Sequence, residues 1–91
     1  MAVYLITYDL KKAGQNYDAL YKEIKSFGDW WHYLESTWLV DTNLSAQTMS
    51  DRIRKVTDSN DLHLVIKLNR GTDYQGWLPK EAWDWINQRL R

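Results

Sequence analysis

The stretch Val3-Tyr4-Leu5-Ile6-Thr7-Tyr8-Asp9 decides the fold that the sequence predicts. Apolar side chains occupy both alternating faces of residues 2 to 8, which is typical of a central β-strand that is buried on two sides. Residues 10 to 14, Leu-Lys-Lys-Ala-Gly, do not continue the strand pattern, and we expect them to belong to the loop that leads to the first helix. Asp9 therefore stands where a strand ends, and it is either a metal-ligating or catalytic acid or the cap of a turn.

A helix and two strands are expected next. Asn16 can cap a helix whose apolar positions recur at helical spacing as far as Phe27, and Gly28 can end it. Residues 30 to 42 are rich in aromatic and β-branched side chains and are too long for one simple strand. We therefore expect two strands that meet near Leu34-Glu35.

A second helix, a last strand and a terminal helix complete the chain. Ser45 is the expected N-cap of the second helix, whose buried stripe continues to Val56. After a turn at residues 58 to 61, residues 62 to 68 alternate in the manner of a strand. Pro79 suits the first turn of the terminal helix.

These elements follow the order βαββαβ with an additional C-terminal helix. That order predicts an α+β, ferredoxin-like sandwich in which two helices cover one face of a four-stranded antiparallel sheet. We expect a single domain from 1 to 91, with a core from 2 to 69, a loop from 70 to 77 and a C-terminal helix from 79 to 90. The second face of the sheet is then open, so a homodimer joined through sheets or sheet edges is expected.

The composition narrows the functional classes. The 12 basic and 12 acidic residues balance, so nucleic acid would have to bind a local patch rather than a general positive field. The lack of cysteine excludes disulfides, thiolate zinc sites and a cysteine nucleophile. No apolar run reaches the roughly 20 residues that span a bilayer, and the first residues lack the pattern of a secretion signal. We expect a cytoplasmic protein without membrane contact.

Asp9 is the candidate catalytic and metal-binding residue. Mg²⁺ and Mn²⁺ prefer oxygen ligands, and a small chain can assemble a site by placing one carboxylate from each protomer about a two-fold axis. His32 and His63 lack the spacing of zinc enzymes, so we interpret each as a half-buried strand residue. The motifs of serine hydrolases, P-loop NTPases and dinucleotide-binding proteins are absent from the sequence.

Basic and aromatic side chains are candidates for contacts with partners. The cations that could bind nucleic acid, each with a solvated surface as the simpler interpretation, are Lys11, Lys12, Arg52 and Arg54. Six Trp and six Tyr supply contact area that suits interfaces as well as interiors. The aromatic residues expected at a dimer or partner interface, with core packing as the alternative, are Tyr8, Trp38, Trp77 and Trp85.

The beginning of the chain resembles the Cas-two family of CRISPR adaptation proteins and its virulence-associated protein D relatives. The matching segments are residues 4 to 10, where a first strand ends in Tyr-Asp-Leu, and residues 35 to 40, Glu-Ser-Thr-Trp-Leu-Val. The chain is also similar to small bacterial proteins labelled "SinR family". The resemblance implies a ferredoxin-like homodimer with Asp9 at the position of the family's metal-associated aspartate.

Two functions remain open at this point. The resemblance implies either metal-dependent cleavage of RNA or DNA at Asp9, with Mg²⁺ or Mn²⁺, or a non-catalytic scaffold that binds duplex DNA and bridges proteins. In the non-enzymatic alternative, the helix around Trp83 and Trp85 or the loop from Tyr74 to Trp77 docks another protein. The same fold also hosts regulatory and small-molecule-binding domains, and no pattern in the sequence identifies a ligand.

Overall fold

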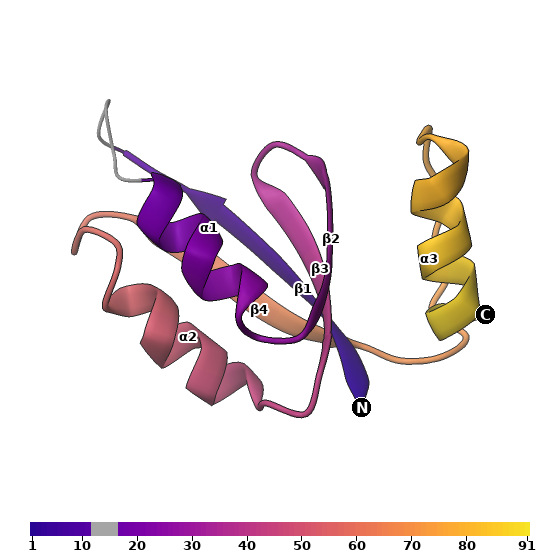
Figure 1. Ribbon diagram of the computed structural model, residues 1–91, viewed down its shortest axis with the longest axis horizontal. Helices are drawn as coiled ribbons and strands as arrows, with labels where there is room; N and C mark the ends of the chain where they lie inside the picture. Colours follow the sequence, from indigo (N-terminus) through magenta and orange to yellow (C-terminus); the bar gives the residue numbers. More distant parts are fainter. Residues whose placement is uncertain (12–16) are drawn as a thin grey trace.

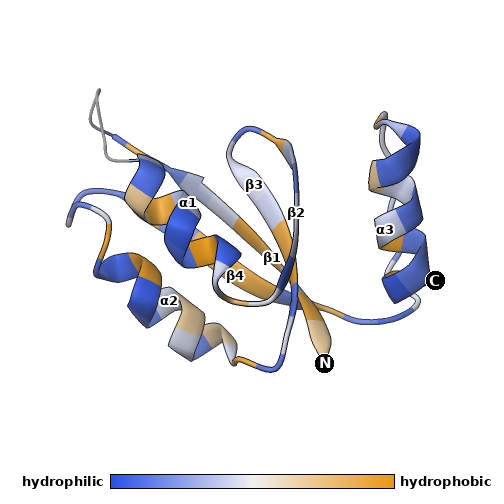
Figure 2. Cartoon of the chain, viewed as in Figure 1, coloured by the Kyte–Doolittle hydropathy of each residue, from blue (hydrophilic) through white to orange (hydrophobic). Residues whose placement is uncertain are grey.

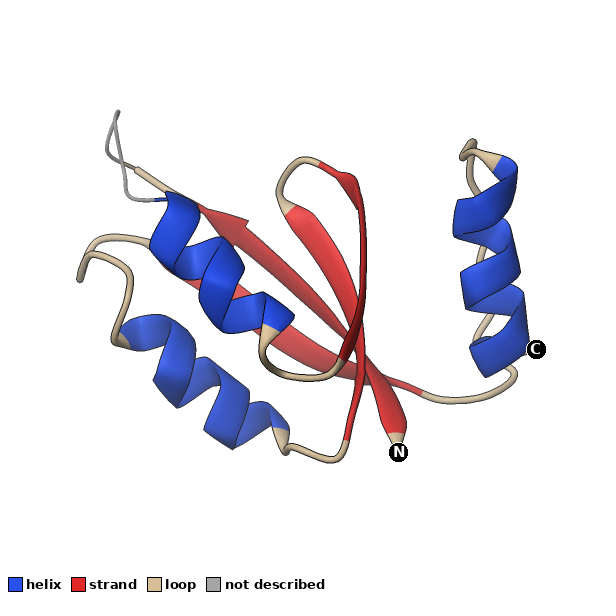
Figure 3. Cartoon of the chain, viewed as in Figure 1, coloured by secondary structure: helices blue, strands red, loops and turns tan. Residues whose placement is uncertain are grey.

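The computed structural model describes residues 1–11 and 17–91 of the chain. The predicted cap Asn16 and the predicted nucleic-acid contact Lys12 lie outside these described residues. The elements are β1 (Ala2–Asp9), α1 (Tyr17–Lys25), β2 (Asp29–Leu34), β3 (Thr37–Thr42), α2 (Ala46–Arg54), β4 (Leu62–Leu68) and α3 (Lys80–Leu90), as Figures 1 and 3 show. Their order is the predicted one. None of these helices is both long and apolar enough to cross a membrane.

The four strands form one antiparallel sheet in the order β2-β3-β1-β4. β1 pairs with β3 on one side and with β4 on the other, which confirms its predicted central place. β2 and β3 meet at the predicted junction, and a register shift between Trp31 and Leu34 interrupts their pairing just before it. The predicted α+β class with a four-stranded antiparallel sheet is therefore confirmed.

The helices α1 and α2 cover one face of the sheet (Figure 1). Tyr4, Ile6 and Tyr8 point from β1 into this first core, because alternate residues of a strand share a face. Trp38 of β3 lies among them and is completely buried. Both helices carry apolar positions between hydrophilic ones (Figure 2), as expected of helices with one buried side. Those buried positions are Leu20, Ile24, Met49 and Ile53.

α3 packs on the second face of the sheet, which the sequence predicted to be open. Val3, Trp31 and Leu39 form a second core there. They pack against α3, and the Trp31 indole N–H donates a hydrogen bond of 3.1 Å to the carbonyl of Ala82. The prediction of an uncovered face is wrong for this part of the sheet, because the apolar stripe of α3 finds its partner within the same chain.

Arg89 of α3 fixes this helix to the sheet by bridging two acids. Asp29 and Asp41 stand directly opposite each other on β2 and β3, where like charges destabilise a sheet. Arg89 donates from Nε to Asp41 Oδ2 at 3.0 Å and from a terminal nitrogen to Asp29. Its guanidinium also lies over the ring of Trp85, 3.9 Å from the centroid. α3 is therefore held by charge as well as by apolar contact.

Candidate functional site at the end of β1

A shallow hollow of about 270 Å³ lies where β1 ends beside the start of β4. Strand pairing builds it, since Asp9 stands opposite Leu62 and Thr7 stands opposite Leu64. The lining residues are Thr7, Tyr8, Asp9, Leu62, His63 and Leu64. Asp9, the candidate acid from the sequence, therefore borders a concave surface with an apolar wall.

Asp9 is exposed and holds a surface ion pair. Its Oδ2 lies 2.5 Å from Nζ of Lys11, and the side chains are 65% and 48% exposed. Such exposed pairs contribute roughly 0–1 kcal/mol, so a ligand with a stronger charge can replace Lys11. Within residues 1–11 and 17–91, Lys11 is the only hydrogen-bond donor to the Asp9 carboxylate.

The cap of the neighbouring loop is a different acid, Asp61. Its carboxylate accepts the backbone N–H of Lys11 at 2.9 Å and that of Asp58 at 2.8 Å. Asp61 is buried, whereas Asp9 is exposed. Within residues 1–11 and 17–91, Asp61 is therefore the acid that caps backbone N–H groups at this end of the sheet.

His63 lies beside the hollow, on the face of β4 that packs toward α2. Its Nε2 is 2.6 Å from the hydroxyl oxygen of Ser50. Burial, followed by the positive charge of Arg54, lowers the pKa of His63 below its ordinary value of 6.5. The ring is therefore neutral at pH 7 and joins α2 to β4 through a neutral hydrogen bond.

The lowered pKa of His63 predicts a loss of stability in weak acid. Below pH 6.5 the unfolded chain binds a proton that the folded ring resists, so the His63 contribution is complete above this pH and is lost as the pH falls through the folded pKa. We expect urea unfolding to show a smaller decrease in stability from pH 7.5 to pH 5 in His63→Gln than in the wild type. Equal decreases in the two proteins would contradict this assignment.

The basic candidates Lys11, Arg52 and Arg54, which the structure describes, lie at separate places. Arg52 bridges α2 to α1, with Nε 2.6 Å from Glu23 Oε1 and a terminal nitrogen 2.8 Å from the hydroxyl of Ser26. Arg54 is exposed at the end of α2. Of the three predicted cations within the described residues, Lys11 is the one that lies beside Asp9.

The aromatic candidates divide between interior and surface. Tyr8 and Trp38 lie in the first core, 7% and 0% exposed, so neither presents its side chain to a partner as the sequence interpretation expected. Trp85 is half-buried under Arg89. Trp77 is fully exposed, at 100%. Trp77 is thus the one of these four that offers its whole side chain to a partner.

An apolar surface that the sequence interpretation missed borders the same hollow. Leu62, Leu64 and Ile66 point from β4 away from α1 and α2 and are 59%, 54% and 48% exposed. We call these three residues the β4 patch. Every second residue from 62 to 68 is Leu or Ile in the sequence, which was the available signal for one apolar face. α3 covers the β2 and β3 side of that face and leaves this side bare.

One chain supplies few metal ligands at this site. In the described part of the chain, no three His, Asp or Glu residues come together in a group that could hold a metal ion. A scan of protein-family models and searches of curated proteins and of solved structures found no match for this chain.

Proposed function

We propose that the chain forms a ferredoxin-like homodimer that binds nucleic acid and hydrolyses it with Mg²⁺ or Mn²⁺ at a site shared by two Asp9 carboxylates. The strand order β2-β3-β1-β4 with α1 and α2 on one face supports the ferredoxin-like assignment. The position of Asp9 beside the β4 patch supports the shared site. The resemblance of residues 4 to 10 to the Cas-two family points in the same direction.

The observation that carries the proposal is that Asp9 and the β4 patch share one face and one end of the sheet. Asp9 is opposite Leu62 in the register, and Leu62 and Leu64 are more than half exposed. Exposed aliphatic side chains in a row on one strand are typical of an interaction surface. A partner that covers the patch is brought against Asp9 by the same contact.

A second copy of the chain fits this surface by facing it. Two-fold symmetry makes each copy bury the same patch of the other, so a single apolar row is used twice. Stacked sheets lie roughly 10 Å apart, which lets side chains from facing strands meet between them. An axis close to Thr7 and Asp9 brings the two Asp9 carboxylates together, whereas edge pairing of two antiparallel β4 strands would place them at opposite ends.

The residues at this site suit an ion that bridges to phosphate. Mg²⁺ is commonly held by one or two carboxylates together with substrate phosphates, and two Asp9 residues supply that number. A bound ion would polarise the phosphodiester and activate a water molecule. Lys11, released from Asp9, becomes available to bind a phosphate oxygen. The β4 patch excludes water from the interface between the two protomers.

Replacing Leu64 with lysine tests the dimer. Because Leu64 is 54% exposed, Leu64→Lys should leave the fold intact while placing a charge in the proposed interface, and we expect dimer affinity to fall roughly 10- to 100-fold. Light scattering coupled to size-exclusion chromatography measures the mass. Leu34→Lys is the matched control, since Leu34 is 47% exposed on the other edge strand. A monomeric wild type, or equal dimerisation of Leu64→Lys, would refute the interface.

Replacing Asp9 with asparagine tests the chemistry. We expect Mg²⁺- or Mn²⁺-dependent cleavage of RNA or DNA to fall at least roughly 100-fold in Asp9→Asn, because loss of a ligand costs at least as much as loss of its supporting hydrogen bond. Asp18→Asn, an exposed acid in the first turn of α1, is the control and should cut normally. Cleavage by Asp9→Asn at the wild-type rate would refute the catalytic role.

A dimeric wild type that cuts neither RNA nor DNA would favour the second candidate, a non-enzymatic scaffold. Trp77 is the observation that supports it, because its side chain is completely exposed in the segment that leads to α3. Exposed Trp residues are common anchors at protein interfaces.

A further inference from the structure

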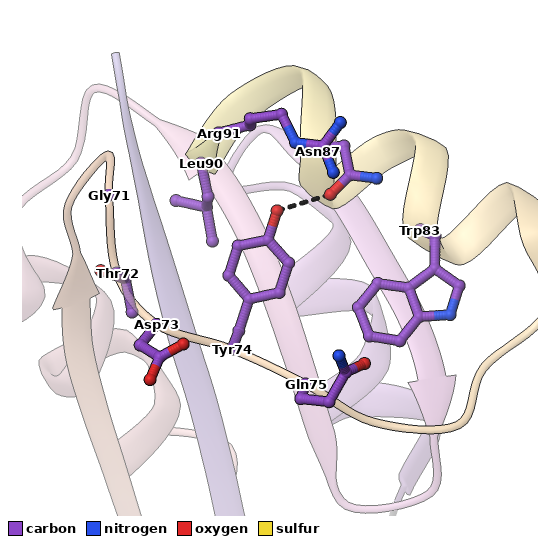
Figure 4. Close-up of a pocket in the computed structure, with 9 residues that line it drawn as sticks. All are labelled: Gly71, Thr72, Asp73, Tyr74, Gln75, Trp83, Asn87, Leu90 and Arg91. Atoms are coloured by element: carbon purple, nitrogen blue, oxygen red, sulfur yellow. Dashed lines mark hydrogen bonds between the residues drawn. The ribbon is translucent and has the colours of Figure 1, made fainter.

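A second hollow, of about 500 Å³, lies between α3 and the segment that leads to it from β4 (Figure 4). This volume falls within the range of roughly 300–1,000 Å³ that is usual for small-molecule sites. Residues 71 to 75 form one wall, and the other wall is formed by Trp83, Asn87 and Leu90 of α3 together with Arg91, which follows this helix. None of these residues belongs to the site at Asp9.

Two aromatic rings form the floor of this hollow. The rings of Tyr74 and Trp83 have centroids 6.1 Å apart and planes inclined by 21°. Figure 4 shows them beside each other with their faces turned to the same open side. The phenol hydroxyl of Tyr74 lies 2.5 Å from Oδ1 of Asn87, which fixes the orientation of the ring. We call Tyr74 and Trp83 the aromatic platform.

The wall opposite α3 is held in place before any ligand arrives. The backbone N–H of Gly71 donates to the carbonyl of Leu90 at 2.8 Å, and Arg70 donates to the carbonyl of Arg91 at 3.0 Å. Gly71 adopts a φ of 85°, a conformation that favours glycine. A preformed site loses little conformational entropy on binding, which favours affinity.

Polar groups with unused hydrogen-bonding capacity surround the platform. Asn87 uses its oxygen for Tyr74 and Gln75 uses its oxygen for Gly76, so each keeps its amide N–H groups for another partner. Asp73 and Arg91 also line the hollow, and their side chains form no ion pair within residues 1–11 and 17–91. The site thus combines a flat apolar floor with amide donors, one anion and one cation.

We propose that the aromatic platform binds a purine ribonucleotide. The base stacks on Tyr74 and Trp83, and the amides of Gln75 and Asn87 donate to acceptors on its edge. Arg91 pairs with the phosphate, and Asp73 accepts hydrogen bonds from the ribose hydroxyls. A free nucleotide and an unpaired nucleotide of an RNA strand present the same chemistry. The proposal is independent of the function assigned to Asp9.

Titration with AMP, followed by calorimetry and by the indole N–H signals in NMR spectra, tests this site. We expect saturable binding that shifts the Trp83 signal. Trp83→Leu should raise the Kd roughly 5- to 100-fold, the usual effect of losing one stacking ring. Trp77→Leu removes an indole that lies outside the hollow and should leave the Kd unchanged. Arg91→Gln, at an exposed position, should weaken AMP binding but not adenosine binding.

Several outcomes would overturn the proposal. These are the absence of binding by both AMP and a short oligoadenylate at millimolar concentration, a Trp83→Leu variant that binds as the wild type does, or displacement of AMP by a neutral disaccharide. Binding of the oligoadenylate alone would support the platform and identify the strand as the source. If Trp83→Leu does not fold, two other results test the proposal: the shift of the Trp83 signal in the wild type on addition of AMP, and the weaker AMP binding of Arg91→Gln. AMP binding by Asp9→Asn should equal that of the wild type, so failure at one site is distinguishable from failure at the other.

Discussion

Trp38→Ala is expected to lower the free energy of unfolding by about 3–5 kcal/mol, the usual cost of removing a buried aromatic side chain. The Trp38 side chain is completely buried in the first core. Its indole stacks on His32 with centroids 3.7 Å apart, and its N–H donates to the hydroxyl of Tyr8 at 3.1 Å. Domains of this size have a total stability of roughly 5–15 kcal/mol, so the expected loss is a large fraction of the total.

Urea unfolding of Trp38→Ala beside Trp77→Ala measures this effect. Trp77 is the matched control because it is fully exposed, and its loss should change stability by less than about 0.5 kcal/mol. Burial raises the pKa of Tyr8 well above its usual range, so its hydroxyl remains protonated and able to donate to the carbonyl of Glu35. Equal stability losses for the two Trp variants would contradict the assignment of the first core.

Gly28→Ala is expected to lower stability by about 2–3 kcal/mol through a steric clash. A Cβ atom at position 28 would lie 2.3 Å from the backbone carbonyl oxygen of Asp41, and a backbone atom cannot turn aside as a side chain can. The conflict falls where the chain leaves α1 and enters β2. It would also disturb Thr42, whose hydroxyl donates to the carbonyl of Phe27 at 2.6 Å and accepts from the backbone N–H of Leu44.

Gly76→Ala is the control for this substitution. Its added Cβ would meet the Trp83 ring at 3.7 Å, an ordinary contact distance, so stability should change by less than about 1 kcal/mol. Thermal unfolding of the two variants provides the comparison. A Gly28→Ala protein as stable as Gly76→Ala would show that the turn at Gly28 relaxes freely.

The helices and strands were predicted well from the sequence because the spacing of apolar residues within each segment indicates whether that segment is a helix or a strand. Alternation placed residues 2 to 8 on a central strand, and the β4 bounds Leu62–Leu68 coincide with the predicted range. Ser45 caps α2 as predicted, since its hydroxyl accepts the backbone N–H of Thr48 at 3.1 Å. The spacing of apolar residues and the capping residue can be recognised without knowing which distant segment each helix or strand packs against.

The contacts between distant segments were not predictable in this way. The apolar stripe of α3 is visible in the sequence, but the stripe does not say which surface it will cover, and the predicted open face is partly closed by it. Arg89 and Asp41 are 48 positions apart, and nothing local pairs them. Asp9 was identified from its place at a strand end, whereas its neighbours Leu62 and Leu64 required the register of β1 and β4.

Cysteine cross-linking at position 9 tests most directly whether the two Asp9 positions converge in a dimer. The chain contains no cysteine, so Asp9→Cys carries a single reactive thiol per protomer. We predict that Asp9→Cys forms a covalent dimer after mild oxidation or treatment with a short bismaleimide. Lys22→Cys is the control and should form none, because Lys22 is exposed on α1, and this helix covers the face of the sheet opposite to Asp9. A non-covalent dimer whose Asp9→Cys form fails to cross-link, or a monomer throughout, would contradict a shared Asp9 site.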